Sequence, residues 1–367
     1  MDKEINFFDT TITDKSIQNV VDVLTSTRIS AGKQCEVFEK KLSERGLINP
    51  ITLNSGTVTM HLALIASGVG PGDEVIIPAQ TFISTGLSVL YVGAKPVFAD
   101  INYYDGNISI ESIKNKITSK TKAIIAVHWA GYPCDLDEIN KLASEFNLSV
   151  IEDAAHAFGA SYKNKPIGSI SRFTSFSFQA IKNLTTGDGG AICCLNEDDF
   201  HLVKKLRWFD IDRENTSVGF LGEREYDATN VGFKYHMNDI AASLGIGNLE
   251  FFDKKLNRLN EISNLYRKKL SNVSGIELLN YNSDRKSSNW LFPLLVEDRT
   301  NFIKKMNSYN IPVSVVHLGI DKNQIFGGKD FSLTNQRKFD ENQIHIPINF
   351  SLDDSQIEKI IKTIKEG

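Results

Sequence analysis

Residues 175–190 read SFSFQAIKNLTTGDGG, and this stretch decides the fold that the sequence predicts. Apolar and polar residues alternate towards Lys182, and a glycine-rich turn follows it. A lysine in a partly desolvated, cationic site has a lowered pKa, and its neutral amine is nucleophilic. A single lysine is far more often a solvated surface residue, so this interpretation needs support from other parts of the chain.

Two further segments supply that support. Residues 54–57 read NSGT and lie between a short predicted strand and a predicted helix, where small residues expose backbone N–H groups suited to a phosphate. Residues 150–156 read VIEDAAH, and an acid after a buried strand can hold a protonated ring nitrogen. Taken alone, the first could be a helix cap and the second a solvated loop or structural ion pair. Together with the lysine they predict a pyridoxal phosphate (PLP) site.

The pattern around these segments is that of an α/β protein. Strands that are apolar throughout alternate with helical stretches, which indicates a parallel sheet covered on both faces. The strands are expected at 74–77, 96–99, 123–127 and 149–151, and the helices near 82–91, 109–116 and 135–146. In such sheets ligands bind beyond the carboxyl ends of the strands.

The pattern changes near residue 238. Apolar residues recur every three or four positions from Leu249 to Leu265, which predicts a long amphipathic helix. Apolar runs at 290–295 and 313–316 and a helix near 353–365 follow. We therefore expect a large cofactor-binding domain over 1–240, including the N-terminal segment, and a smaller α+β domain over 241–367.

Composition excludes several classes of protein. The 367 residues are 41% hydrophobic and 23% charged, which is ordinary for a globular chain and unlike a disordered chain or a coiled coil. The net charge of −4 does not suggest a general nucleic-acid-binding surface, and it leaves a local basic patch open. The four cysteines have no CxxC spacing, which favours a reduced, cytoplasmic compartment. No apolar run approaches the roughly 18 residues that span a bilayer, and no metal site is predicted.

Seven motifs in order along nearly the whole chain carry a family resemblance. They are SAG at 30–32 ahead of FE at 38–39, NSGT at 54–57, GPGDEVI at 70–76, EDAAH at 152–156, FSF at 176–178 with KN at 182–183, GDGGA at 187–191, and GF at 232–233 with MNDI at 237–240. The sequence resembles the sugar aminotransferases of the DegT/DnrJ/EryC1/StrS group. The resemblance implies fold type I of the PLP-dependent transferases, with a large domain built on a mostly parallel sheet and a smaller C-terminal α+β domain.

The resemblance also implies roles for individual residues. Lys182 would form the Schiff base with PLP and move the proton, and Asp153 would pair with the pyridine nitrogen. His156 would lie near the ring oxygen, and Phe82 would stack on the ring, although simple core packing is the alternative for Phe82. The residues that would bind the phosphate are Gly56, Thr57 and Ser177.

Five other candidates are less specific. Lys234 stands where many family members have an asparagine that reaches the cofactor phosphate of the partner subunit, and it either binds that phosphate or faces solvent. His128 ends a strand and is either directed into the site or a hydrogen-bonded structural histidine. Arg213 meets either a carboxylate or phosphate of the substrate, or only a surface acid. Ser30 is a candidate for contact with either the sugar nucleotide or the neighbouring subunit, and His317 is a candidate for substrate contact by position alone.

By the resemblance, the function is amino transfer. An amino acid, in first place L-glutamate, would give its amino group to a nucleotide-linked keto-deoxysugar, in the biosynthesis of an amino sugar for a surface polysaccharide or glycan. The enzyme would be a homodimer with shared active sites. One alternative is a sugar dehydratase of the same family, but its members replace the lysine with histidine, and Lys182 argues against it. The other is a non-catalytic PLP-binding regulator. The identity of the nucleotide and the position of the ketone, C3 or C4, stay open.

Overall fold

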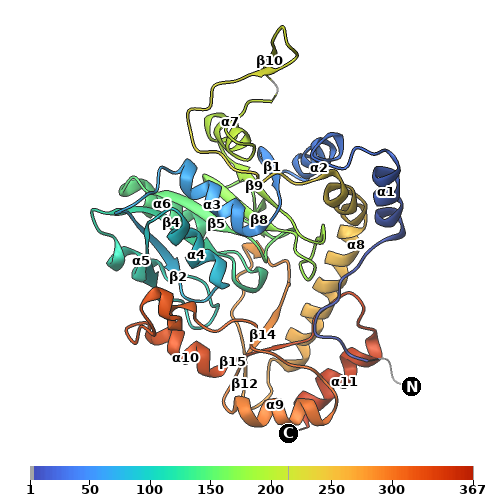
Figure 1. Ribbon diagram of the computed structural model, residues 1–367. Helices are drawn as coiled ribbons and strands as arrows, with labels where there is room; N and C mark the ends of the chain where they lie inside the picture. Colours follow the sequence, from blue (N-terminus) through green and yellow to red (C-terminus); the bar gives the residue numbers. More distant parts are fainter. Residues whose placement is uncertain (1–3, 214, 367) are drawn as a thin grey trace.

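A seven-stranded, mostly parallel sheet forms the centre of the larger part of the molecule (Figure 1). The computed structural model describes residues 4–213 and 215–366. The strand order is β1-β9-β8-β5-β4-β2-β3. Strands β3, β2, β4, β5 and β8 run parallel, whereas β9 is antiparallel to both β8 and β1. The bounds are β1 Pro50–Leu53, β2 Glu74–Pro78, β3 Lys95–Ala99, β4 Thr121–Val127, β5 Ser149–Asp153, β8 Phe173–Ser177 and β9 Gly190–Cys194.

Helices cover both faces of this sheet, as the apolar strands predict. Alternate strand residues belong to different cores: Ile76 packs in one, and its neighbours Val75 and Ile77 pack in the other. The first core includes residues of α2 (Lys33–Glu44), α5 (Ile110–Lys116), α6 (Leu136–Glu145) and α8 (Asp239–Leu270). The second includes residues of α3 (Gly56–Ala66), α4 (Ile83–Tyr91) and α7 (Glu197–Leu206). Helix α1 (Asp14–Thr25) lies against α8.

A second, smaller sheet lies at the other end of the molecule (Figure 1). It is antiparallel and has the order β12-β14-β15. Its strands are β12 Ile276–Leu278, β14 Phe292–Val296 and β15 Gln343–Ile346, and the helices of this part are α9 Arg299–Ser308, α10 Thr334–Asn342 and α11 Asp354–Lys365. The apolar run at 313–316 forms only an isolated bridge, between Ser314 and His345.

Helix α8 joins the two parts. Its first half gives Ile246 and Phe252 to a core of the large sheet, and its second half gives Leu259 and Tyr266 to the core of the small part. A domain boundary near residue 240 stays a prediction, since the helix that begins at Asp239 serves both cores.

The N-terminal segment also crosses between the parts. Ile5 is buried in the core of the small part. The amide of Asn349 donates to the carbonyl of Asn6 at 2.7 Å, and the amide of Gln356 donates to that of Glu4 at 3.1 Å. The start of the described chain is thus hydrogen-bonded to residues about 350 positions away.

One hairpin projects from the body of the molecule (Figure 1). It consists of β10 (Ser217–Val218) and β11 (Arg224–Glu225), and its tip carries Phe220 and Leu221 almost fully exposed. The remaining short elements are β6 Ser161–Tyr162, β7 Lys165–Pro166, β13 Arg285–Lys286, η1 Trp129–Gly131, η2 Ile320–Lys322 and η3 Gln324–Phe326. Among the residues described, no helix combines the length and the apolar character that crossing a membrane would require.

Candidate active site

The carboxyl ends of β5 and β8 bring the predicted lysine and acid together. Asp153 is the last residue of β5, and Lys182 follows β8 in a short loop. Burial of the Lys182 amine lowers its pKa to about 7, while the nearby Asp153 carboxylate acts in the opposite direction. In a large fraction of the molecules the Lys182 amine is therefore neutral near pH 7, as nucleophilic and proton-transfer chemistry requires.

Asp153 is a buried acid held by neutral donors. One carboxyl oxygen accepts a hydrogen bond from the Thr85 hydroxyl at 2.7 Å, and the other accepts from the Ala155 N–H at 3.2 Å. Burial raises the pKa of this carboxyl, and these hydrogen bonds and the charge of Lys182 only partly oppose the shift. A cationic group bound beside Asp153 would restore its ionised form.

His156 lies beside the same lysine. Its ring is buried and stacks on the indole of Trp290, with 3.8 Å between the ring centroids. Within the described part of the chain, its Nδ1 atom has no hydrogen-bond partner. Burial, followed by the charge of Lys182, holds the pKa of His156 well below its ordinary value. A neutral imidazole with an unpaired nitrogen is thus available to a polar ligand atom.

The phosphate-binding candidates also meet. Gly56 and Thr57 open helix α3, which the side chain of Ser55 caps by accepting from the Val58 N–H at 3.4 Å. A Cβ atom placed on Gly56 would lie 2.8 Å from Cβ of Ser177, so this glycine permits a close approach of α3 to the end of β8. Backbone N–H groups and a hydroxyl therefore converge at a helix N-terminus, an arrangement suited to phosphate.

Phe82 and His317 flank one another. Phe82 precedes α4, and its side chain is 52% exposed, which is more than core packing allows. Its ring centroid lies 5.3 Å from that of His317. Burial lowers the pKa of His317 to about 3, and Lys182 and His345 add to the shift. The amides of Gln80 and Gln343 both donate to the carbonyl of His317, at 3.0 Å each, and so fix this segment.

His128 is engaged elsewhere. Its Nδ1 accepts from the Cys134 N–H at 3.1 Å, so its Nε2 carries the proton that is shared with Glu152 at 2.8 Å. Glu152 in turn accepts from the N–H of Ser171. Since both ring nitrogens are occupied by protein groups, the geometry favours the structural interpretation of His128 that the sequence left open.

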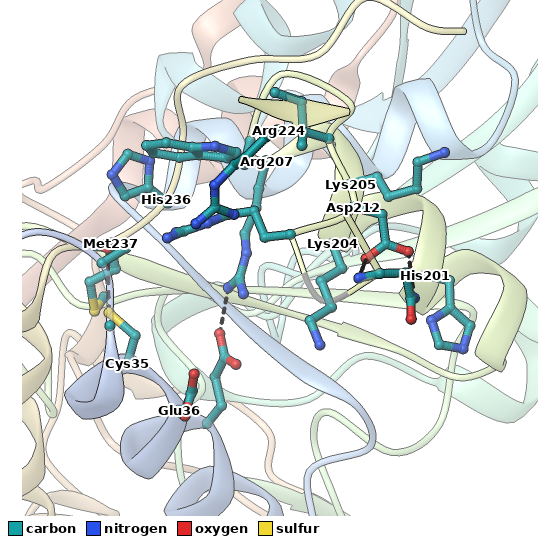
Figure 2. A pocket seen from close by; sticks show the side chains of 17 residues that line it. Cys35, Glu36, His201, Lys204, Lys205, Arg207, Asp212, Arg224, His236 and Met237 are labelled. Atoms are coloured by element: carbon teal, nitrogen blue, oxygen red, sulfur yellow. Dashed lines mark hydrogen bonds and ion pairs between the residues drawn. The ribbon is translucent and has the colours of Figure 1, made fainter. Parts of the chain in front are cut away.

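A separate basic pocket of about 520 Å³ lies between α2 and the segment that follows α7 (Figure 2). Its cationic lining residues are Lys204, Lys205, Arg207, Arg213 and Arg224. Arg213 is exposed and lies over the ring of Trp208, 4.9 Å from its centroid. The main chain of Ser30, which is next to the lining residue Ala31, accepts from the N–H of Asp239.

Lys234 is exposed and forms an isolated antiparallel β-bridge with Trp208, which lines this pocket. Among the described residues, no hydrogen bond, ion pair or ring contact links Ser30, Arg213 or Lys234 to Lys182 or Asp153. The chain thus presents two groups of candidate residues, one around Lys182 and one around the basic pocket.

Sequence reasoning missed Trp290, which contacts Lys182. The indole N–H donates to the carbonyl of Ile181 at 2.9 Å across 109 positions. In the sequence, residue 290 only opens an apolar run that predicts a strand, so no local signal connects it with the lysine.

The residues around Lys182 fit PLP. The buried carboxyl of Asp153 is suited to a cationic partner, His156 has an unpaired buried nitrogen, and the close approach of Gly56 to Ser177 leaves donors at a helix N-terminus. These three features match, in turn, the protonated ring nitrogen, the ring oxygen and the phosphate of PLP.

Comparison with known proteins agrees with this chemistry. The sequence model of the DegT/DnrJ/EryC1/StrS aminotransferase family matches residues 10–365. GDP-perosamine synthase of Escherichia coli O157:H7 is 35% identical over 80% of this chain and 78% of its own length. The crystal structure of the sugar aminotransferase CalS13 from Micromonospora echinospora has a TM-score of 0.94 at 29% identity and covers 99% of this chain and 100% of its own.

A structure in the PLP form is also similar. The sugar aminotransferase Spr1654 of Streptococcus pneumoniae, described as putative, has a TM-score of 0.89 at 30% identity, with 99% of this chain and 98% of the other covered. Because these likenesses extend over almost the full chain, they confirm the predicted fold class, fold type I of the PLP-dependent transferases.

Proposed function

Because the chain belongs to the DegT/DnrJ/EryC1/StrS aminotransferase family, we propose that it transfers an amino group from L-glutamate to a nucleotide-linked keto-deoxysugar, with PLP as its cofactor. The observation that carries the proposal is the lysine amine of Lys182, with a pKa lowered to about 7, beside the buried carboxyl of Asp153. The product would be an amino sugar for a surface polysaccharide or glycan, made in the cytoplasm.

Each residue around Lys182 would hold one part of PLP. Asp153 would bind the protonated ring nitrogen, and His156 would donate to or accept from the ring oxygen. Phe82, half of whose surface is exposed, would stack on the ring. Backbone N–H groups at the start of α3, from Gly56 and Thr57, and the Ser177 hydroxyl would bind the phosphate. When bound, PLP supplies an electron sink for the charge that develops at the reacting carbon.

Lys182 would carry the proton. Near pH 7 a large part of its Nζ is unprotonated, so it can take a proton from the reacting carbon of the amino donor. The resulting ammonium would give that proton to the C4′ position of the cofactor in the same half of the cycle. In the second half Lys182 would move a proton the other way, from C4′ to the sugar carbon that receives the amine. The neutral imidazole of His317, next to Phe82, would contact the sugar.

The basic pocket would bind the anionic part of the sugar nucleotide. The substrate bound there would react at Lys182 of a second copy of the chain. Arg213 lines this pocket, Ser30 and Lys234 lie next to it, and no contact joins them to Lys182 within the described residues. Exposed apolar side chains at the hairpin tip, Phe220 and Leu221, support an interface there. We therefore propose a homodimer with shared active sites.

Spectroscopy of the PLP-loaded protein tests the proposal. L-Glutamate should replace the absorbance of the lysine-bound cofactor with that of its amine form, because the first half of the reaction needs no sugar. Lys182→Ala should not support this change at a comparable rate. The proposal fails if no amino donor produces the change in the unaltered protein. A panel of nucleotide-linked keto-sugars, added to the amine form, would then identify the acceptor by the return of the first spectrum.

A further inference from the structure

A segment of the small part of the molecule reaches into the site and holds the loop that carries Lys182. The carbonyl of Ser288 accepts from the side-chain amide of Asn183 at 2.8 Å, and the indole N–H of Trp290 donates to the carbonyl of Ile181 at 2.9 Å. Both residues that flank Lys182 are thus bound to residues 288–290. The hydroxyl of Ser288 also donates to the carbonyl of His156 at 2.5 Å, which ties the histidine to the same segment.

The ring of Trp290 is in contact with the amine itself. The Nζ atom of Lys182 lies 3.7 Å from the ring centroid. The indole is buried and stacks on His156 with 3.8 Å between centroids, and on Phe8 of the N-terminal segment at 5.6 Å. Held by these neighbours and by the hydrogen bond to Ile181, the ring has little freedom to move.

We propose that Trp290 is a positioning residue for Lys182: its N–H fixes the loop, and its ring is the surface on which the amine rests whenever it is not bonded to the cofactor. An aromatic face attracts an ammonium group, which suits a lysine that has just accepted a proton. The same ring is apolar and shields the amine from water, which favours loss of that proton. Because burial is the largest influence on the pKa of Lys182, this second effect prevails.

The other ionisable groups near the amine are few. Asp153, at the end of β5, favours the ammonium form. His156 and His317 are neutral near pH 7, because burial holds the pKa of His156 well below its ordinary value and lowers that of His317 to about 3. Burial rather than a second cation therefore lowers the pKa of the amine, and among the described residues the ring in contact with it is that of Trp290.

Chemical labelling of the apoprotein tests the proposal without any substrate. The proposal for Trp290 rests on the proposed role of Lys182, but the labelling measures only the free amine. The proposal for Trp290 can therefore fail while amino transfer stands, and amino transfer can fail while the proposal for Trp290 stands. Trace acetic anhydride is applied over a range of pH, and mass spectrometry follows the peptide that contains Lys182. The readouts are the midpoint of the pH profile and the limiting rate at high pH.

Two substitutions separate the ring from the N–H group. In Trp290→Leu we expect the limiting rate to rise roughly tenfold and the midpoint to move from about 7 towards the ordinary lysine value of 10.5, because water and reagent reach the amine. Trp290→Phe keeps an aromatic face and removes the hydrogen bond to Ile181, so a smaller rise of about threefold is expected.

Tyr266→Phe is the matched control. It removes a buried hydrogen bond to a backbone carbonyl, that of Pro347, in the core of the small part, and the tyrosine has no contact with Lys182. We expect its profile to equal that of the unaltered protein. The proposal is overturned if folded Trp290→Leu keeps both the midpoint and the rate within about twofold, or if Tyr266→Phe changes them as much. Should Trp290→Leu not fold, an unchanged profile in Trp290→Phe overturns it.

Discussion

At the scale of single residues, burial moves two neighbouring groups towards their neutral forms. It lowers the pKa of the Lys182 amine to about 7 and raises that of the Asp153 carboxyl. The attraction between the two charged forms does not cancel these pKa shifts, because it is smaller than the cost of removing both groups from water. A ligand with a positive ring nitrogen and an electrophilic carbon would use both groups at once.

The lowered lysine pKa predicts how cofactor loading depends on pH. Only the unprotonated amine can bond to PLP, so the rate should be low below pH 7, rise through a midpoint near 7 and level off above it. An ordinary lysine would need a pH above 10 for the same rate. Stopped-flow absorbance of apoprotein mixed with PLP measures the profile, and a rise confined to pH 9 and above would contradict the assignment.

Gly56 predicts a steric effect on the phosphate site. In Gly56→Ala the new Cβ would lie 2.8 Å from Cβ of Ser177, so α3 and the end of β8 have to move apart. We expect PLP to bind about tenfold more weakly. Titration of the apoprotein measures this. Gly70→Ala is the control, because no atom lies within 4 Å of the added Cβ there, and equal losses in both variants would remove the argument.

Sequence reasoning placed the residues that follow strands better than those brought in from elsewhere. Lys182, Asp153 and His156 gather as predicted, because parallel strands end at one edge of the sheet. Glu152 and Asp153 are successive residues of β5, so their side chains point to opposite faces of the sheet. The side chain of His128 contacts Glu152, whereas Asp153 lies near Lys182. The sequence could not show which of the two acids His128 would contact, because the register of the strands was not known.

At the scale of elements, a carboxylate of one helix caps another. Helix α2 starts after Gly32, which has no side chain to cap it. Instead, one oxygen of Asp239, the first residue of α8, accepts from the N–H groups of Gly32 and Cys35 at 2.9 and 3.1 Å. Since α2 packs on α8, this contact couples the start of both helices.

Removal of that carboxylate should destabilise the protein. Asp239→Ala leaves N–H groups of α2 without an acceptor, and we expect a cost of about 1–2 kcal/mol, read as a lower midpoint of thermal unfolding. Asp14→Ala, which removes an exposed acid in the first turn of α1, should change the midpoint much less. Equal midpoints for the two variants would show that the cap adds nothing.

Elements with a strong apolar pattern were predictable, and those set by single contacts were not. The runs at 74–77 and 149–151 correspond to β2 and β5 because both faces of these strands are buried. The run at 313–316 looks similar in composition, yet it is only half-buried and pairs at Ser314 alone. The β10–β11 hairpin is exposed, so no core imposes a hydrophobic pattern on it.

At the scale of the whole molecule, the two groups of candidate residues predict complementation between inactive variants. Lys182→Ala and Arg213→Ala would each be inactive as homodimers if both groups serve one reaction. Subunits mixed in equal amounts should regain about a quarter of the full activity, because half of the dimers are hybrids and each hybrid has one intact site. Refolding or subunit exchange followed by an activity assay checks this. No recovery in hybrids of proven composition would place Lys182 and Arg213 in the same subunit's site, or make the pocket irrelevant.

The hydrogen bonds between the N-terminal segment and the small part of the molecule bear on how the chain folds during translation. Glu4 and its partner Gln356 are 352 positions apart. A ribosome that adds about 5–20 residues per second needs roughly 20–70 s to make the chain between them. For most of that time the residues that surround Ile5, from Leu259 onwards, and the Trp290 ring that stacks on Phe8 have not been made. The nascent large sheet can therefore assemble early, while the indole that holds the reactive lysine reaches its place only in the final part of translation.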